Sequence, residues 1–417
     1  MIYARTSPVG EVLFCFWLYT SIMAVNPLNY YIIILMNTIL ISTITGIKPV
    51  VSLYAYSLGH SPQEISVIIA SSALFPALLA LQIGKWIDHF GTRPIVIIGN
   101  GMFIVALLLS VIYPSFFTFL IQLAIIGVAS TCLMLCLQKR VGSLGGEIDR
   151  TVANYSLFGS IGAMIGPTMS SYLYDYYGYQ ICIFFNIALI AIALSSEMGM
   201  RNADGIPPLK TDEIQQSNLI EKESIWTLMK NRDMRNAMLI GGLIFSNREL
   251  FSVYFPLLAE NLGISPTMTG VLLSFSGLTM LIIRFTQTSF VRFFGRMKIL
   301  TWSLFVTSII YLVTPFSPSI VVLFVLIGIL GAGFGLAQPL STATVLETTI
   351  PERRGAVLGV QMTINRVSQF GIPLIFGGIG SLIGVSAIFW GSGLVLMIFG
   401  YMTRPMSIRV KQTKKES

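Results

Sequence analysis

The sequence predicts an all-α membrane protein whose twelve transmembrane helices form two pseudo-symmetric six-helix bundles. Three observations lead to this fold class: an apolar composition, a series of membrane-length apolar stretches and an internal repeat. Of the 417 residues, 54% are hydrophobic and 11% are charged, and the mean hydropathy is +0.78. A soluble globular protein carries roughly 25% charged residues. This composition therefore excludes a soluble enzyme, a disordered protein and a nucleic-acid-binding domain.

Twelve stretches have the roughly 20 mostly apolar residues that a helix needs to cross a hydrocarbon core of about 30 Å. Those of the first bundle, 29–198, are predicted at 29–58, 63–84, 94–113, 116–138, 151–174 and 179–198. A charged linker at 199–235 follows. The second bundle, 236–403, contains the spans predicted at 236–262, 265–291, 297–314, 317–346, 356–380 and 384–403. The segment 404–417 is basic and is predicted to be a cytoplasmic tail.

The distribution of Lys and Arg predicts the orientation, because cytoplasmic loops carry an excess of these residues. With both termini in the cytoplasm, all but four of the 26 basic residues lie on the cytoplasmic side, and the outer loops carry only Glu64, Asp175 and Glu260. We therefore expect a multi-pass protein of a bacterial inner membrane.

The N-terminal segment 1–28 contains an apolar run at 12–25 that resembles a signal peptide. Cleavage of such a peptide would invert every loop, which would place the basic residues outside. A short interfacial helix is one alternative. An extension that precedes a natural start at Met23 is another.

The two halves are related by an internal repeat. The segment Leu-Gly-His-Ser-Pro at 58–62 recurs at 262–266 as Leu-Gly-Ile-Ser-Pro, and Phe90-Gly91 recurs at the same spacing as Phe294-Gly295. With six spans in each half, both halves have the same polarity in the membrane. This indicates a parallel duplication, with a binding site between the halves near the midplane.

The loop after the second span carries a family motif. Residues 84–93 read Gly-Lys-Trp-Ile-Asp-His-Phe-Gly-Thr-Arg, which resembles the signature of the major facilitator superfamily (MFS); the matching positions are Gly84, Asp88, Gly91 and Arg93. Positions 89 and 92 hold His and Thr where the signature has basic residues. The resemblance implies the MFS fold and a gating role for the motif. Gly84 would admit a helix of the other bundle, and Asp88 would face the positive N-terminal end of the eleventh span.

The fifth span carries a second, partial motif. Gly162, Gly166 and Pro167 look like the Gly-x-x-x-Gly-Pro core of a motif associated with MFS exporters, although Ala153 stands where the full motif has glycine. The resemblance favours export over uptake. The fourth span lacks the arginine, and the first span lacks the acidic residue, that proton-coupled exporters of the superfamily use. Their coupling mechanism is therefore not transferred to this chain.

Charged side chains within the spans are the candidate site residues, because a charge at the bilayer centre costs roughly 2.5–3.5 kcal/mol on insertion scales. Lys48 of the first span lies at a depth similar to that of Arg248 and Glu249 in the seventh, its repeat partner. Arg284 lies nearer the cytoplasmic end of the eighth span, from where its side chain can extend to the interface.

Arg366 lies in the middle of the eleventh span, with Asn365 and Gln369 within one helical turn. Two interpretations of the charges remain open. They form structural ion pairs, in which Glu249 neutralises Lys48. Alternatively, the excess of positive charge suits a small organic anion such as a carboxylate metabolite or siderophore, since Arg offers a bidentate fork to carboxylates.

The second interpretation assigns substrate binding to Lys48, Arg248, Asn365, Arg366 and Gln369. Glu249 is then the candidate proton carrier. We expect a secondary active transporter that works by alternating access and exports an anion with proton coupling; an uptake permease and a polyspecific drug efflux pump are the alternatives.

The remaining expectations concern chemistry and partners. The sequence has no nucleotide-binding loop of the Gly-x-x-x-x-Gly-Lys-Ser/Thr kind, no nucleophile–base pattern and no metal-ligand spacing among its four cysteines. We therefore expect no enzymatic activity, no cofactor and no metal. The expected partners are the lipid bilayer, an anionic small molecule and a proton or other coupling ion, without nucleic acid, and the expected state is a monomer.

Overall fold

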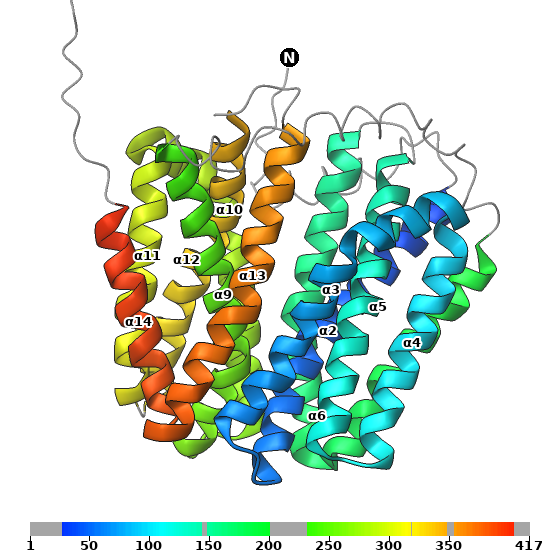
Figure 1. Cartoon of the computed structure of the whole chain (residues 1–417), viewed down its shortest axis with the longest axis horizontal. Coiled ribbons are helices and arrows are strands. Elements are labelled where there is room, and N and C mark those ends of the chain that lie inside the picture. The colour runs from blue at the N-terminus through cyan, green and yellow to red at the C-terminus, as the bar shows by residue number, and fades with distance from the viewer. Residues whose placement is uncertain (1–26, 144–147, 201–231, 318, 348–353, 404–417) are drawn as a thin grey trace, which may run out of the picture.

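The computed structural model describes residues 27–143, 148–200, 232–317, 319–347 and 354–403, and within them the regular structure is helical (Figure 1). The first half contains α2 (Pro27–Ser57), α3 (Pro62–Phe90), α4 (Thr92–Ile112), α5 (Phe116–Ser143) and α6 (Ile148–Gly199). The second half contains α9 (Arg232–Asn261), α10 (Pro266–Phe294), α11 (Arg296–Val313), the 3-10 turn η1 (Thr314–Phe316), α12 (Ile320–Glu347), α13 (Arg354–Ile383) and α14 (Val385–Met402). The segments 1–26 and 404–417 and most of the linker lie outside the described residues.

These helices follow the predicted spans. Among those described, 10 are long and apolar enough to cross a membrane. One of them, α6, contains both the fifth and the sixth predicted span, joined at Gly178 with φ 82°. The seventh span is α9, which falls outside this group because Asn247, Arg248 and Glu249 interrupt its apolar sequence. The chain is thus an all-α, multi-pass membrane protein.

The internal repeat reappears as matched turn geometry. Gly59 and Gly263 both have positive φ, at 88° and 73°, and each stands before a helix capped by serine, Ser61 or Ser265. A non-glycine residue rarely adopts this backbone conformation, so the repeated glycines preserve the turn between the first two helices of each half. The halves are therefore pseudo-symmetric in structure as well as in sequence.

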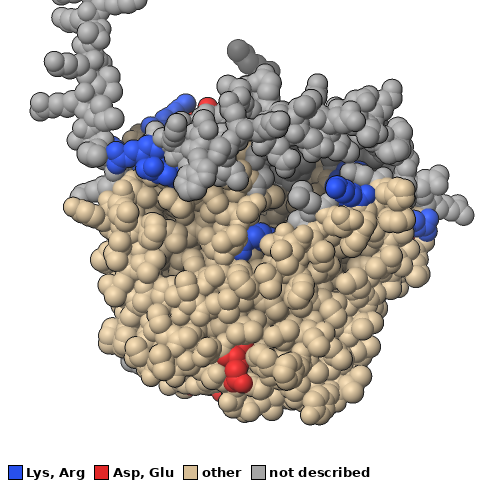
Figure 2. Space-filling model, viewed as in Figure 1, with Lys and Arg blue, Asp and Glu red and all other residues tan. Residues whose placement is uncertain are grey.

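The two halves lie side by side in Figure 1, with α2–α6 on the right and α9–α14 on the left. Helix α3 packs against α13, and α6 packs against α10, across the interface between them. Figure 2 shows Lys and Arg mainly along the upper edge and an acidic group at the lower edge, with a nearly uncharged band between.

We call the upper end the basic end. Among the described residues it carries Lys85, Arg93, Lys139, Arg292, Arg296 and Lys298. The opposite end, with Glu64, Asp175 and Glu260, is called the acidic end. Such a charge asymmetry with an apolar band between the ends is typical of a protein that spans a bilayer.

Candidate functional site

An ion pair joins the two halves in the middle of the molecule. Lys48 Nζ of α2 donates to Glu249 Oε2 of α9 at 2.5 Å, and the two side chains are 13% and 21% exposed. An ion pair between Lys48 and Glu249, one of the two interpretations left open by the sequence, is therefore present in the structure. Pro49 within α2 removes one backbone donor beside Lys48, whereas the Lys48 carbonyl accepts a hydrogen bond from Ser52 Oγ at 2.9 Å.

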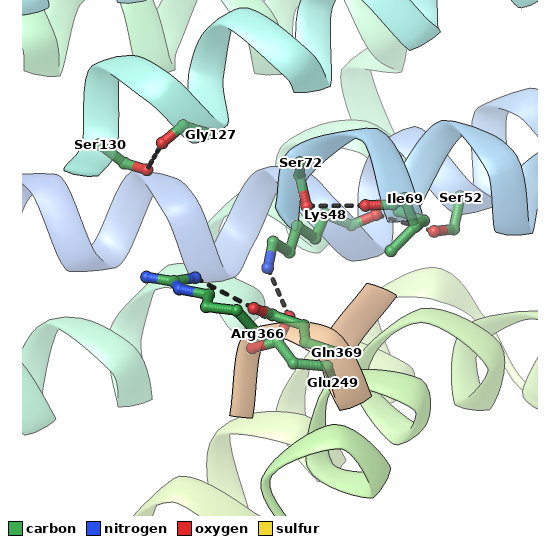
Figure 3. A network of polar contacts seen from close by, with 9 residues as sticks. All are labelled: Lys48, Ser52, Ile69, Ser72, Gly127, Ser130, Glu249, Arg366 and Gln369. Carbon is green, nitrogen blue, oxygen red and sulfur yellow. Dashed lines mark hydrogen bonds and ion pairs between the residues drawn. The ribbon is translucent and has the colours of Figure 1, made fainter. Parts of the chain in front are cut away.

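Two further predicted residues lie next to this pair on α13 (Figure 3). Arg366 Nη1 donates to Gln369 Oε1 at 3.0 Å, and Glu249 lies near enough to Arg366 for their charges to interact. Asn365 is buried, and its Oδ1 has no hydrogen-bond partner among the described residues. Helices α2, α9 and α13 thus bring four polar side chains together: Lys48, Glu249, Arg366 and Gln369.

A cavity of about 560 Å³ lies between the two halves. From α2, α5 and α6 it is lined by Asn37, Ile41, Met134, Gln138, Val141, Tyr155, Ser156, Gly159, Ser160 and Ala163. From the second half it is lined by Arg248 of α9 and by Met280 and Arg284 of α10. These lining residues lie on the segments of the helices that run from the middle of the membrane, at the depth of Lys48, toward the basic end. A volume of this size suits a small organic molecule.

The structure places Arg284 at the cavity. Its side chain lines the cavity together with Arg248, a position that was not expected from the sequence. Sequence reasoning also missed Asn37 and Gln138, although a polar residue within an apolar span is a recognisable signal for both. Depth along α10 gave no indication that Arg284 turns inward.

At the acidic end the halves are in contact. Tyr254 of α9 shares a buried hydrogen bond with Ser66 of α3 and donates a second one to the Pro62 carbonyl at 3.2 Å. Thr168 Oγ1 of α6 donates to Ser274 Oγ of α10 at 2.7 Å. The hydrogen bonds between halves among the described residues gather on this side of the cavity, so the acidic end is closed.

The signature loop between α3 and α4 lies at the basic end. Among the residues that the structure describes, a Cβ on Gly84 would meet no heavy atom within 4 Å, and the close helix approach expected there stays a prediction. Gly91 has φ 83° and ends α3, and Arg93 Nη2 lies 3.5 Å from the Met198 carbonyl oxygen of the same half. The side chain of Asp88 lies outside the described part of the structure, so its contact with the eleventh span stays a prediction.

The span-five motif packs α6 against α2. A Cβ on Gly162 would lie closer than 3.0 Å to the Thr38 carbonyl oxygen, and one on Gly166 would lie equally close to that of Ser42. Pro167 faces the other half, where its carbonyl oxygen would lie 2.6 Å from a Cβ on Gly270 of α10. The motif therefore sets the position of α2, the helix that carries Lys48.

Repeated helical halves around a cavity that closes at one end form the architecture of a secondary transporter. The family model of the Major Facilitator Superfamily matches residues 30–230 and 237–417. An uncharacterised MFS-type transporter of Methanocaldococcus jannaschii is 20% identical over 364 residues, which cover 86% of this chain and 92% of the relative.

Two solved structures share the fold. The nucleoside transporter NupG, in a mutant form, is similar with a TM-score of 0.76 and 13% identity over 90% of this chain and 100% of that chain. A POT family transporter in complex with 5-aminolevulinic acid gives a TM-score of 0.73 and 12% identity, over 90% and 95% of the two chains.

The protein is therefore a multi-pass membrane transporter. It belongs to the major facilitator superfamily. Members of this family move solutes and are not enzymes, in agreement with the prediction from sequence.

Proposed function

We propose that this transporter moves a small organic anion across the bacterial inner membrane, in the export direction and with proton coupling. Both termini lie in the cytoplasm, and the protein acts as a monomer. The two bundles, 29–198 and 236–403, move relative to each other and expose the cavity to one side of the membrane at a time.

The charge balance of the site carries the proposal of an anion. Glu249 is the carboxylate of the group, and it faces three cations: it pairs with Lys48 and interacts with Arg248 and Arg366. A surplus of cations in a water-poor site attracts negatively charged solutes and disfavours cationic drugs. The hydrogen-bonding side chains of Asn365 and Gln369 would orient the bound anion.

The contacts at the two ends support alternating access. Excess Lys and Arg support the assignment of the basic end to the cytoplasmic side, and contacts such as that of Tyr254 with Ser66 hold the two halves together at the acidic end. This conformation is then the one that faces the cytoplasm. The signature residues Gly84, Asp88, Gly91 and Arg93 would form the cytoplasmic gate when the cavity faces outward.

Coupling and direction are assigned to separate features. Protonation of Glu249 would release Lys48 and break the only described ion pair between the halves, which suits a residue that carries the coupling proton. The span-five residues Gly162, Gly166 and Pro167 resemble the exporter motif and support export over uptake.

A reconstituted transport assay tests this proposal. Proteoliposomes with an imposed pH gradient are offered anionic, neutral and cationic metabolites of similar size. Removal of one charge-assisted hydrogen bond costs about 1.5–3 kcal/mol, so Lys48→Ala and Arg366→Ala are each expected to slow anion transport roughly tenfold or more. Arg296→Ala is the matched control, because Arg296 pairs with Glu347 at the exposed basic end. Unchanged anion transport in both site variants, or a preference for cations, would refute the proposal.

Glu249 has a separate test in the same vesicles. Glu249→Gln keeps the shape of the side chain but carries no titratable proton, so it is expected to lose the response to the pH gradient while exchange of anion for anion continues. Glu347→Gln serves as its control. If Glu249→Gln still accumulated anion in response to the gradient, Glu249 would not be the proton carrier.

A further inference from the structure

We infer that Arg248 and Arg284 form a subsite for a dianionic group, so that the substrate carries two negative charges, as in a phosphate monoester or a dicarboxylate. The inference rests on the proposed function and narrows its substrate class. It also assigns a binding role to Arg284.

The first observation concerns the hydrogen bonds and ion pairs of the two guanidinium groups. Among the described residues, neither Arg248 nor Arg284 takes part in a hydrogen bond or in an ion pair within 4.0 Å. The buried Nε of Arg284 has no hydrogen-bond partner. Buried polar groups in native proteins are rarely left unsatisfied, and each exception calls for an explanation. A ligand that accepts hydrogen bonds provides one.

The second observation is the repulsion between the two arginines. Both side chains are positively charged and both line one cavity, so their like charges repel each other. Glu249, the carboxylate that acts on Arg248, is already hydrogen-bonded to Lys48 at 2.5 Å. A monoanion would neutralise only one of these arginines, whereas a dianion would neutralise both. Arg offers several donors in a fixed plane, which match phosphate and carboxylate oxygens.

The third observation is the wall that faces the arginines. The first half contributes neutral polar side chains to the cavity, namely Asn37, Gln138, Tyr155, Ser156 and Ser160. No acidic residue is part of the described lining. The cavity therefore has a cationic side and a neutral, hydrogen-bonding side. This arrangement suits an anionic head with a hydroxylated or amide-bearing body of a size that fits about 560 Å³.

Ligand-induced stabilisation of the full-length protein in lipid nanodiscs tests the inference. The probes are succinate and glycerol 3-phosphate as dianions and butyrate as a monoanion, at constant pH and ionic strength. A ligand that binds only the folded state raises the unfolding temperature according to its affinity. The wild type is expected to bind at least one dianion about tenfold or more tightly than butyrate, since the second arginine adds a further charge-assisted interaction. Comparison of the two dianions distinguishes a phosphate ester from a dicarboxylate.

Variants then assign the effect to the arginines. Arg284→Gln and Arg248→Gln are each expected to lose the preference for the dianion. Arg292→Gln, two turns along α10 at the exposed basic end, is expected to keep it. Without ligand, Arg284→Gln should unfold at a higher temperature than the wild type because the repulsion is relieved; a merely structural Arg284 would give a lower temperature.

The outcomes separate this inference from the proposed function. Equal affinity for butyrate and both dianions, or an unchanged dianion preference in Arg284→Gln, would overturn the dianion subsite while anion transport stands. Failure of the proteoliposomes to transport any anion would overturn the proposed function itself.

Discussion

At the scale of single residues, two ion pairs differ in how deeply they are buried and in how many hydrogen bonds they make. Arg140 donates to both carboxylate oxygens of Glu197, at 2.6 and 2.7 Å, and its Nε donates to Thr92 Oγ1 at 2.8 Å. The Glu197 side chain is 0% exposed. Lys48 and Glu249, by contrast, share a single contact and remain partly exposed. The first pair holds α4, α5 and α6 together, whereas the second is the pair that, as we propose, opens when Glu249 is protonated.

The Arg140–Glu197 pair leads to a stability prediction. Glu197→Ala removes the buried carboxylate that pairs with Arg140, and removal of one member of a buried ion pair typically costs roughly 3–5 kcal/mol. Thermal unfolding of the protein in detergent is expected to show a marked loss of stability.

The exposed pair of Arg296 and Glu347 supplies the comparison. Glu347→Ala removes an ion pair at the surface, where such pairs contribute about 0–1 kcal/mol, and is expected to unfold at nearly the wild-type temperature. Equal unfolding temperatures for Glu197→Ala and Glu347→Ala would contradict the structural role of Glu197. From the sequence, Arg140 is only one of the basic residues counted on the cytoplasmic side, because linear position near a helix end does not reveal packing between helix ends.

At the scale of helices, the boundaries were predictable because membrane thickness sets the length of each span. Helix α4, for example, covers Thr92–Ile112, and the predicted span is 94–113. The predicted fifth and sixth spans, 151–174 and 179–198, likewise lie on either side of Gly178, whose φ of 82° separates two helical segments within α6. The partners of the helices could not be predicted, because glycine in an apolar run marks close packing without naming the neighbour.

The packing of α2 on α6 gives a prediction at this scale. A Cβ on Gly166 would lie closer than 3.0 Å to the Ser42 backbone oxygen, so Gly166→Ala must push the two helices apart. Overpacking of this kind costs about 1–3 kcal/mol, and displacement of α2 would also weaken the contact between Lys48 and Glu249. Thermal unfolding and anion transport measure the two effects.

Gly101 of α4 offers the control for this experiment. A Cβ there would meet no atom of the described residues within 4 Å, and alanine is a better helix former than glycine by roughly 0.8–1.0 kcal/mol. Gly101→Ala is therefore expected to be neutral or slightly stabilising. If both variants behaved alike, close packing at Gly166 would not limit the approach of α2 and α6.

For the whole molecule, the relative position of the two halves decides the geometry of the site. The sequence identified Lys48, Arg248, Glu249 and Arg366 as membrane charges, and the pairing of Lys48 with Glu249 followed from their matched depth. The sequence did not show which of these side chains join the central cluster and which line the cavity, because this depends on the orientation of α9 and α13 about their own axes. The inward position of Arg284 depends on the same packing.

Closure at the acidic end can be tested by cross-linking. Thr168 Oγ1 and Ser274 Oγ lie 2.7 Å apart on α6 and α10, so cysteines at both positions are well placed for a disulfide. Oxidation of the Thr168→Cys/Ser274→Cys variant is expected to stop transport, because the halves can no longer separate there, and reduction is expected to restore it. Each single cysteine variant is the control, and undiminished transport by fully cross-linked protein would argue against this movement.

The polar middle of α9 has a consequence for how the chain enters the membrane during synthesis. With Arg248 and Glu249 at its centre, α9 inserts poorly by itself, since each such charge costs roughly 2.5–3.5 kcal/mol. Its counter-ion Lys48 lies 201 residues earlier, so α2 has left the ribosome and occupies the bilayer before α9 emerges. The first half of the nascent chain thus supplies the electrostatic partner that the translocating second half requires, and the two halves depend on each other from biogenesis onward.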